Sequence, residues 1–333
     1  MDQIDKKIAG IIPWGDEPIN QTDLAFNYNN IPFHSDTAIV VTSWWGHLVW
    51  LRNTLRNYRL TGKFVICAYD VPYHPWTNLA YEARFLPSPE IMIFAHNWVF
   101  KHMTFDTKKR DGWFWDAYLA KGIVSNFDNF KYVFTVNGDC IWEKPENVDE
   151  IIKMLGDNDL MSISRERETI HTCAVVYKRD AFLSIFDYMA NKHKYPILGS
   201  YQPERMLDEA VKRLKLKELV APKQPMELDG SSVDHYSRYS QDSTWKEIVG
   251  YRNLYAEHAT AGVEGKEPVE REYFDMDYVE RVLPGEEQTT LLKYYETGDR
   301  RYIHMFWDRN ETSWYDRVHH PLEWYGDKPI YRE

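Results

Sequence analysis

The feature that most constrains this chain is the run from Lys131 to Trp142, which reads KYVFTVNGDCIW. Its β-branched and aromatic residues form an unbroken apolar stretch, and such stretches are typical of strands buried on both faces of a mostly parallel sheet. The stretch stops at Asn137, Gly138 and Asp139. Because such sheets bind ligands at the carboxyl ends of their strands, we expect a binding site at these three residues.

The chemistry of this short polar segment has two interpretations. A carboxylate beside a glycine that lets a ligand approach the backbone can hold a hard divalent cation against phosphate oxygens. Alternatively, the strand simply runs into an Asn-Gly turn and Asp139 is solvated, which is the favoured interpretation for an isolated Asn-Gly-Asp. The rest of the chain therefore has to decide between a metal ligand and a turn residue.

The preceding part of the chain predicts a parallel sheet. Thr37 to Thr42 reads as a strand, a helix with apolar residues from Leu48 to Tyr58 follows, and Phe64 to Ala68 reads as the next strand. A strand, helix and strand with short links predict a right-handed crossover and a parallel pair. Glu90 to Ala95 is expected to add a third strand, and a helix that begins after Asp111 leads into the run described above.

Later segments continue the alternation of helices and strands. We expect helices over about 148–155, 181–189 and 203–214, and strands at 160–164 and 173–177. The fold class is therefore α/β, a mostly parallel sheet covered by helices on both faces. We divide the chain into an N-terminal arm (1–35), a catalytic domain (36–228) and a C-terminal extension (229–333) that packs on the domain and completes its site.

Composition narrows the possible partners and the compartment. A net charge of −11 argues against general affinity for nucleic-acid backbone or anionic membrane. No apolar run approaches the ~20 residues that span a bilayer, so we expect a soluble, cytoplasmic protein. The three cysteines show no metal-ligand spacing and their odd number gives no disulfide framework, so we expect buried thiols in a reducing compartment.

The segment from Ala120 to Asp139 resembles the part of GT-A glycosyltransferases in which a helix with a basic residue precedes the strand that carries an Asp-x-Asp metal motif. Lys121 occupies the basic position, and Asn137, Gly138 and Asp139 occupy the motif. The first acid of the motif is thus Asn in this chain. The resemblance implies a Rossmann-like GT-A fold and a nucleotide-sugar donor, with the last acid as the direct metal ligand.

Further segments resemble the same family in the same order along the chain. The end of the first strand resembles the segment that borders the nucleoside, and Asp70 resembles the acid that meets the base or ribose. The segment YIHMFWDRN resembles the C-terminal part in which a His completes the metal site and a basic residue reaches the diphosphate. The resemblance implies metal ligation by Asp139 and His304, with His258 in reserve, and donor contacts from Thr42, Ser43, Trp44, Asp70, Lys121, Asn137, Gly138 and Arg309.

The acceptor side has its own candidates. Cys173 to Phe186 resembles the acceptor-side strand and helix, and Glu204 lies roughly where inverting members place their general base, with Asp208 one turn later as the second candidate. Structural interpretations stand beside these: an acid at a helix start commonly complements the helix dipole, and a His among aromatic residues is commonly part of the core. Lys121 also fits a surface lysine, and Asp70 a turn cap before Pro72.

The resemblance implies a metal-dependent glycosyltransferase, a hexosyl- or pentosyltransferase that uses a nucleotide-diphosphate sugar, and the residue types suit Mn²⁺ or Mg²⁺ as the metal. The expected acceptor is a hydroxyl in glycan or polysaccharide synthesis, and a hydroxylated DNA base is a rarer choice that the acidic charge disfavours. One alternative is a sugar-phosphate nucleotidyltransferase, although its glycine-rich phosphate loop is replaced here by TSWWGH. The other is a non-catalytic scaffold that binds nucleotide or glycan.

Overall fold

A computed structural model describes residues 24–27, 35–44, 50–70, 91–96, 112–162, 165–166, 169–192, 203–221, 244–254, 293 and 296–297. The helices are α2 (Leu51–Arg59), α5 (Gly112–Val124), η3 (Pro145–Asn147), α6 (Val148–Met154), α7 (Arg179–Lys192), α8 (Pro203–Leu214) and α10 (Thr244–Val249). The strands are β1 (Leu24–Asn27), β2 (Thr37–Trp44), β3 (Phe64–Asp70), β4 (Ile91–His96), β5 (Tyr132–Asn137), β6 (Cys140–Trp142), β7 (Leu160–Ser162), β8 (Arg165–Glu166), β9 (Thr169–Ile170), β10 (Ala174–Lys178), β11 (Glu218–Val220) and β12 (Tyr251–Asn253).

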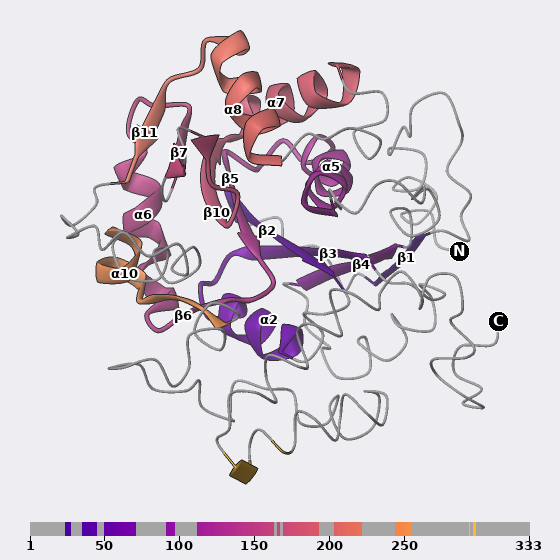
Figure 1. Ribbon diagram of the computed structural model, residues 1–333, viewed down its shortest axis with the longest axis vertical. Coiled ribbons are helices and arrows are strands. Elements are labelled where there is room, and N and C mark those ends of the chain that lie inside the picture. The colour runs from indigo at the N-terminus through magenta and orange to yellow at the C-terminus, as the bar shows by residue number, and fades with distance from the viewer. Residues whose placement is uncertain are drawn as a thin grey trace.

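The described strands form an eight-stranded sheet in the order β1-β4-β3-β2-β5-β10-β7-β11 (Figure 1). β4, β3, β2 and β5 are parallel to one another. β1 and β10 run antiparallel to their neighbours, and β7 and β11 are parallel to each other. The prediction of an α/β fold with a mostly parallel sheet is confirmed.

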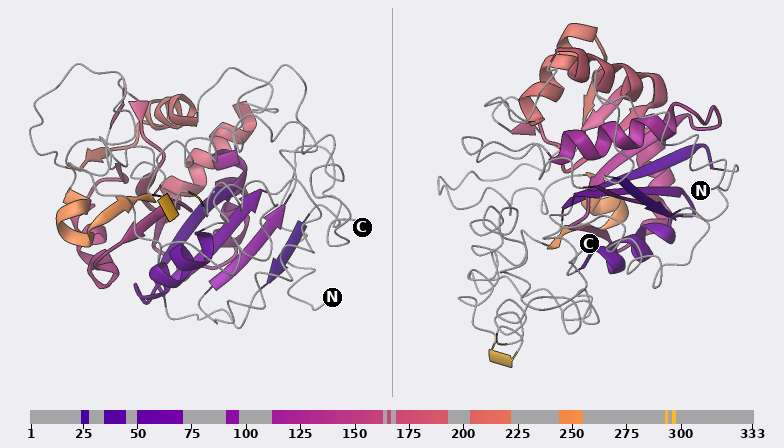
Figure 2. Two further views of the ribbon diagram at one scale, coloured as in Figure 1. Left: turned by 60° about the horizontal axis from the view of Figure 1, so that its bottom comes forward. Right: turned by 90° about the vertical axis from the view of Figure 1, so that its right-hand side faces the viewer.

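Helices cover both faces of this sheet (Figure 2, right). α5, α7 and α8 pack on one face, over alternate residues of the strands such as Val40, Ile66 and Val133. The other face is covered by α2, α6, α10 and the small β6-β12 sheet, where Phe134 of β5 contacts the rings of Trp142 and Trp245 at centroid distances of 5.0 and 4.7 Å. Because β5 is buried on both faces, its apolar residues need no alternation with polar ones.

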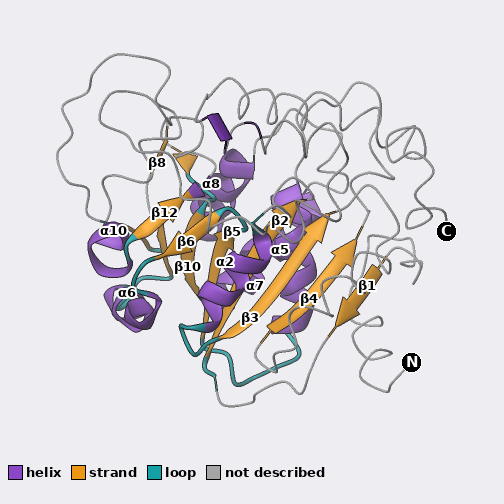
Figure 3. Cartoon of the chain, turned by 90° about the horizontal axis from the view of Figure 1, so that it is seen from below, coloured by secondary structure: helices purple, strands orange, loops and turns teal. Residues whose placement is uncertain are grey.

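The segment that includes α10 and β12 packs against β6, the strand that follows β5 in the sequence. β12 pairs antiparallel with β6, and Figure 3 shows the two strands side by side next to α10. Asn147 holds the end of α10, because its side-chain amide donates a hydrogen bond to the carbonyl of Ile248 at 2.9 Å. Residues more than 100 positions apart in sequence therefore meet directly beside Asp139.

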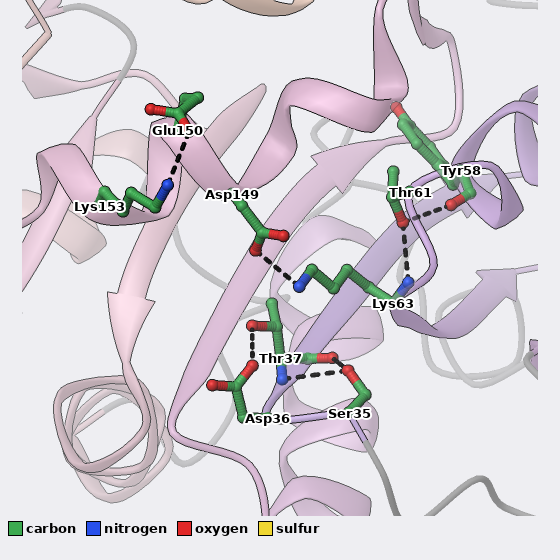
Figure 4. A network of polar contacts seen from close by, with 9 residues as sticks. All are labelled: Ser35, Asp36, Thr37, Tyr58, Thr61, Lys63, Asp149, Glu150 and Lys153. Carbon is green, nitrogen blue, oxygen red and sulfur yellow. Dashed lines mark hydrogen bonds and ion pairs between the residues drawn. The ribbon is translucent and has the colours of Figure 1, made fainter.

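The edge of the sheet where β2 and β3 begin is fastened by polar side chains (Figure 4). Lys63, just before β3, forms an ion pair with Asp149 of α6 at 2.6 Å. At the start of β2, the Ser35 hydroxyl donates a hydrogen bond to the Thr37 carbonyl and accepts one from the Thr37 backbone N–H. These contacts hold the amino ends of β2 and β3. The candidate functional residues lie at the opposite edge, at the carboxyl ends of β2 and β5.

Two details differ from the expected arrangement. β1 lies within the segment that we expected to be an irregular arm, and it extends the sheet at the edge beside β4. The strand expected at 173–177 begins one residue later and runs antiparallel to β5. Among the described helices, none is long and apolar enough to cross a membrane.

Candidate functional site

The candidate site lies where the order of the strands reverses direction. From β2 the chain moves outward to β3 and β4, and it then returns to the other side of β2 to form β5. The carboxyl ends of β2 and β5 are side by side, with Thr42 opposite Asn137 in the register. Open α/β sheets bind ligands in the crevice at such a switch point. The polar residues that end the two strands therefore lie at the position where the topology favours a ligand.

Asn137 links three segments at this switch point. Its side-chain oxygen accepts a hydrogen bond from the Thr42 hydroxyl at 3.0 Å, and its side-chain nitrogen donates to the Cys173 sulfur at 3.5 Å. Its backbone N–H donates to the Cys173 carbonyl, while that of Gly138 donates to the Thr42 carbonyl at 2.8 Å. Both ends of the Asn137 amide are thus bound to protein groups. We interpret the residue as a structural bridge between β2, β5 and the turn before β10.

Asn137→Asp is therefore expected to weaken the fold, although it would restore an Asp-x-Asp motif. The carboxylate cannot donate to the Cys173 sulfur, and it places a second negative charge next to the buried Asp139. We expect the free energy of unfolding to fall by about 1–3 kcal/mol, measured by urea denaturation at neutral pH. Asn126→Asp, at an exposed position after α5, is the matched control. A more stable Asn137→Asp protein would contradict the bridging role.

Asp139 is a buried carboxylate, only 6% exposed, in the turn between β5 and β6. Its backbone carbonyl accepts a hydrogen bond from Leu254 at 2.7 Å, and its Oδ1 atom lies 3.6 Å from the Cys140 sulfur. The solvated-turn interpretation is therefore wrong, because water does not surround this side chain. Its place at the carboxyl end of a parallel strand suits a carboxylate that meets a cation and a ligand phosphate, so Asp139 stays a candidate ligand.

The residues at the switch point fit a cation of the Mg²⁺ or Mn²⁺ type that is shared with a substrate. The described part of the chain contains no group of three or more His, Cys, Asp or Glu residues that could hold a metal by itself. Mg²⁺ is commonly bound by one or two carboxylates together with substrate phosphates and water. Asp139 is the described residue that would supply such a carboxylate.

Asp116 of α5 is a functional candidate that the sequence analysis missed. It is 1% exposed, and its carboxylate accepts a hydrogen bond from the backbone N–H of Ser43 at 2.8 Å. The Ser43 hydroxyl is itself buried, and it has no hydrogen-bond partner among the residues that the structure describes. The signal in the sequence was an acid on the apolar face of a helix, between Trp113 and Ala120. Asp116 fixes the end of β2 at the switch point.

Lys121 lies further along α5 than Asp116, and its ammonium forms an ion pair with Asp187 of α7. Five residues of helix correspond to about 7.5 Å, so Lys121 is displaced along the helix from the residue that reaches Ser43. The backbone of Asp70 lies opposite Trp44 at the ends of β3 and β2. For Asp70 and Trp44, the structure describes the backbone but not the side chain. His304, Arg309 and the reserve His258 lie outside the described residues.

Glu204 is connected to the same edge of the sheet. It lies at the start of α8 and accepts a hydrogen bond from the Thr172 hydroxyl at 3.2 Å. Thr172 precedes Cys173, which bonds to Asn137, so a short chain of contacts joins Glu204 to the switch point. Asp208 is buried on the same helix and forms an ion pair with Lys212 at 2.6 Å. Glu204 therefore contacts the turn before β10 through Thr172.

A scan against protein-family models and a search of curated proteins both find no match. The structure is similar to solved structures at low sequence identity. The galactosyltransferase LgtC, with donor and acceptor sugar analogues, is 11% identical over 56% of this chain and 73% of LgtC, with a TM-score of 0.38. The apo form of the glycosyltransferase GlyE from Streptococcus pneumoniae TIGR4 is 9% identical over 56% of this chain and 45% of GlyE, with a TM-score of 0.36.

A third similar structure is the 4-diphosphocytidyl-2C-methyl-D-erythritol synthase from Anaerococcus prevotii DSM 20548. It is 10% identical over 57% of this chain and 89% of the synthase, with a TM-score of 0.36. Glycosyltransferases are thus among the structures that this chain is similar to. Because the TM-scores are low, the function proposed below is based on this chain's own residues.

Proposed function

We propose that the chain is a glycosyltransferase that uses a nucleotide-diphosphate sugar together with Mn²⁺ or Mg²⁺. The observation that carries this proposal is the buried Asp139 at the carboxyl end of β5, beside the end of β2 at the switch point. This is where a dinucleotide or nucleotide phosphate binds in open α/β sheets, and a carboxylate there suits a cation that meets phosphate oxygens. The resemblance of Ala120 to Asp139 to the GT-A metal segment supports the same assignment.

Different residues of the chain would bind different parts of the donor. Asp139 would hold the cation, which when bound neutralises the charge that develops on a diphosphate leaving group. Asp116 keeps the backbone of Ser43 in place, and a donor contact from the buried Ser43 hydroxyl stays a prediction. The link between Thr42 and Asn137 keeps the two strand ends together. The roles of Asp70, Lys121, His304 and Arg309 in donor and metal binding stay predictions.

The acceptor would be a hydroxyl group, for which a glycan is the favoured source, and Glu204 is the proposed general base. Its hydrogen bond with Thr172 orients the carboxylate toward the turn that adjoins Asn137. Glu204→Gln is expected to lower the transfer rate about 10²- to 10⁴-fold, since the amide cannot take a proton. Donor binding should persist, measured by thermal shift with nucleoside diphosphate. Glu209→Gln, on the same helix, is the control. An unchanged transfer rate in Glu204→Gln would mean that Glu204 is not the general base and that Asp208 or another residue takes this role.

The experiment that tests the proposal is a thermal-shift screen of nucleotides and nucleotide sugars, each with Mn²⁺ and with EDTA. We expect stabilisation by one nucleoside diphosphate that requires Mn²⁺, followed by transfer or slow hydrolysis of the matching nucleotide sugar. Binding of a nucleotide sugar with no turnover on any acceptor or on water would support the scaffold instead. Release of pyrophosphate from a nucleoside triphosphate and a sugar phosphate would identify a nucleotidyltransferase.

A further inference from the structure

Two buried side chains and one backbone N–H join Asp139 to the segment that contains β12. The Cys140 sulfur lies 3.6 Å from Asp139 Oδ1 and 3.0 Å from the Tyr251 hydroxyl oxygen. Tyr251 belongs to β12 and is fully buried. Next to it, the Leu254 N–H donates to the Asp139 carbonyl. The backbone carbonyl of Asp139 is therefore contacted by Leu254, and its carboxylate by Cys140, which Tyr251 contacts in turn.

The direction of the hydrogen bonds follows from what each group can donate. An ionised carboxylate only accepts, so in the contact with Asp139 the thiol must be the donor. The single thiol proton is then used, and the sulfur is left to accept from the Tyr251 hydroxyl. The order of donation is Tyr251 to Cys140 to Asp139.

We propose that Tyr251, acting through Cys140, is a positioning residue that fixes the orientation of the Asp139 carboxylate and thereby its selectivity between cations. This proposal rests on the proposed metal-binding role of Asp139. Groups that hydrogen-bond a metal ligand set its orientation, and their loss commonly weakens metal binding. The thiol contact uses one lone pair of Oδ1, and it would favour contact with a cation through a single carboxylate oxygen. Mg²⁺ and Mn²⁺ sites accept such a ligand, whereas Ca²⁺ commonly takes both oxygens of a carboxylate.

The test compares Mn²⁺ and Ca²⁺ affinity, each measured by calorimetry on the full chain with the nucleoside diphosphate present. Cys140→Ala and Tyr251→Phe are each expected to lower Mn²⁺ affinity about tenfold and to narrow the preference for Mn²⁺ over Ca²⁺. The double variant should lose no more than Cys140→Ala alone, because the two side chains act in series. Cys140→Ser keeps a donor and should recover most of the affinity. A merely structural role would not change the ratio of the two affinities.

Tyr177→Phe is the matched control, since it removes a buried tyrosine hydroxyl from β10, where the register places Tyr177 opposite Val133. A second readout needs no metal: the infrared S–H band of Cys140, obtained as the difference between the native protein and Cys140→Ser. Its hydrogen-bonded shift should change in Tyr251→Phe. If the native protein binds Mn²⁺ but the variants match it, or if the band does not move, the positioning role is wrong while the proposed function stands. If the native protein binds neither Mn²⁺ nor Mg²⁺, both are wrong.

Discussion

Asp139→Ala is expected to abolish the Mn²⁺-dependent stabilisation by a nucleoside diphosphate and to lower sugar transfer by at least about a hundredfold. The carboxylate is buried at the end of β5, and no described His, Cys or acid cluster offers a second metal site. Without it, a cation at the switch point would lose the carboxylate that the described residues are proposed to supply. The measurement is the thermal shift with Mn²⁺ and with EDTA, followed by transfer kinetics at saturating donor.

The controls separate ligand loss from loss of folding. Asp180→Ala removes a carboxylate whose side chain is 95% exposed at the start of α7, so stabilisation by Mn²⁺ and nucleotide should be unchanged. Asp139→Asn keeps the size of the side chain and removes its charge, and it should lose the metal effect as well. If Asp139→Ala retains the full Mn²⁺-dependent shift with its native unfolding transition, the carboxylate is not the metal ligand and the proposed site is wrong.

The sequence predicted the centre of the fold because local signals and tertiary context agree there. The run that became β5 is apolar without alternation, and the structure buries it between helices on both faces. The strands β2 and β3 and the crossover helix α2 follow from equally local patterns. The position of Asp139 at the end of a buried strand was therefore predictable, as was the meeting of β2 and β5 at one edge.

Other parts of the site depend on pairings that no local pattern encodes. The direction of β10 is set by how the chain returns through β8 and β9, so its antiparallel pairing placed Cys173 beside Asn137 without a signal in either segment. The docking of β12 on β6 joins residues that are far apart in sequence. The contact between Tyr251 and Cys140 therefore became visible only in the structure.

In the helix before β5, the resemblance and the burial of side chains draw attention to different residues. The resemblance drew attention to Lys121, whose side chain is held by Asp187, and it passed over Asp116, which bonds to Ser43 at the switch point. An acid at an apolar position of a helix is a stronger physical signal than a lysine near its end, because a buried carboxylate needs a partner. Lys121 as a diphosphate contact stays a prediction.

Gly250→Ala is expected to separate β12 from β6 and to lower the free energy of unfolding by about 3 kcal/mol. Gly250 has a φ of +62°, and a Cβ atom there would lie 2.6 Å from Glu143 Cβ and 2.8 Å from Glu143 Oε2. The Cβ cannot be accommodated without moving Glu143, whose backbone N–H bonds to the Gly250 carbonyl. The variant should also lose Mn²⁺ affinity, because displacement of β12 removes the contacts of Tyr251 and Leu254 with Cys140 and Asp139.

Gly62→Ala provides a matched control for the backbone strain alone. Gly62 has a similar φ of +69°, but a Cβ atom there would meet nothing within 4 Å. We expect a loss of about 1 kcal/mol and unchanged Mn²⁺ affinity, since the strain of a left-handed residue is the only effect. Urea denaturation of both variants gives the comparison. Equal losses in the two variants would mean that the close contact with Glu143 contributes nothing. A Gly250→Ala protein that binds Mn²⁺ normally would mean that β12 does not support Asp139.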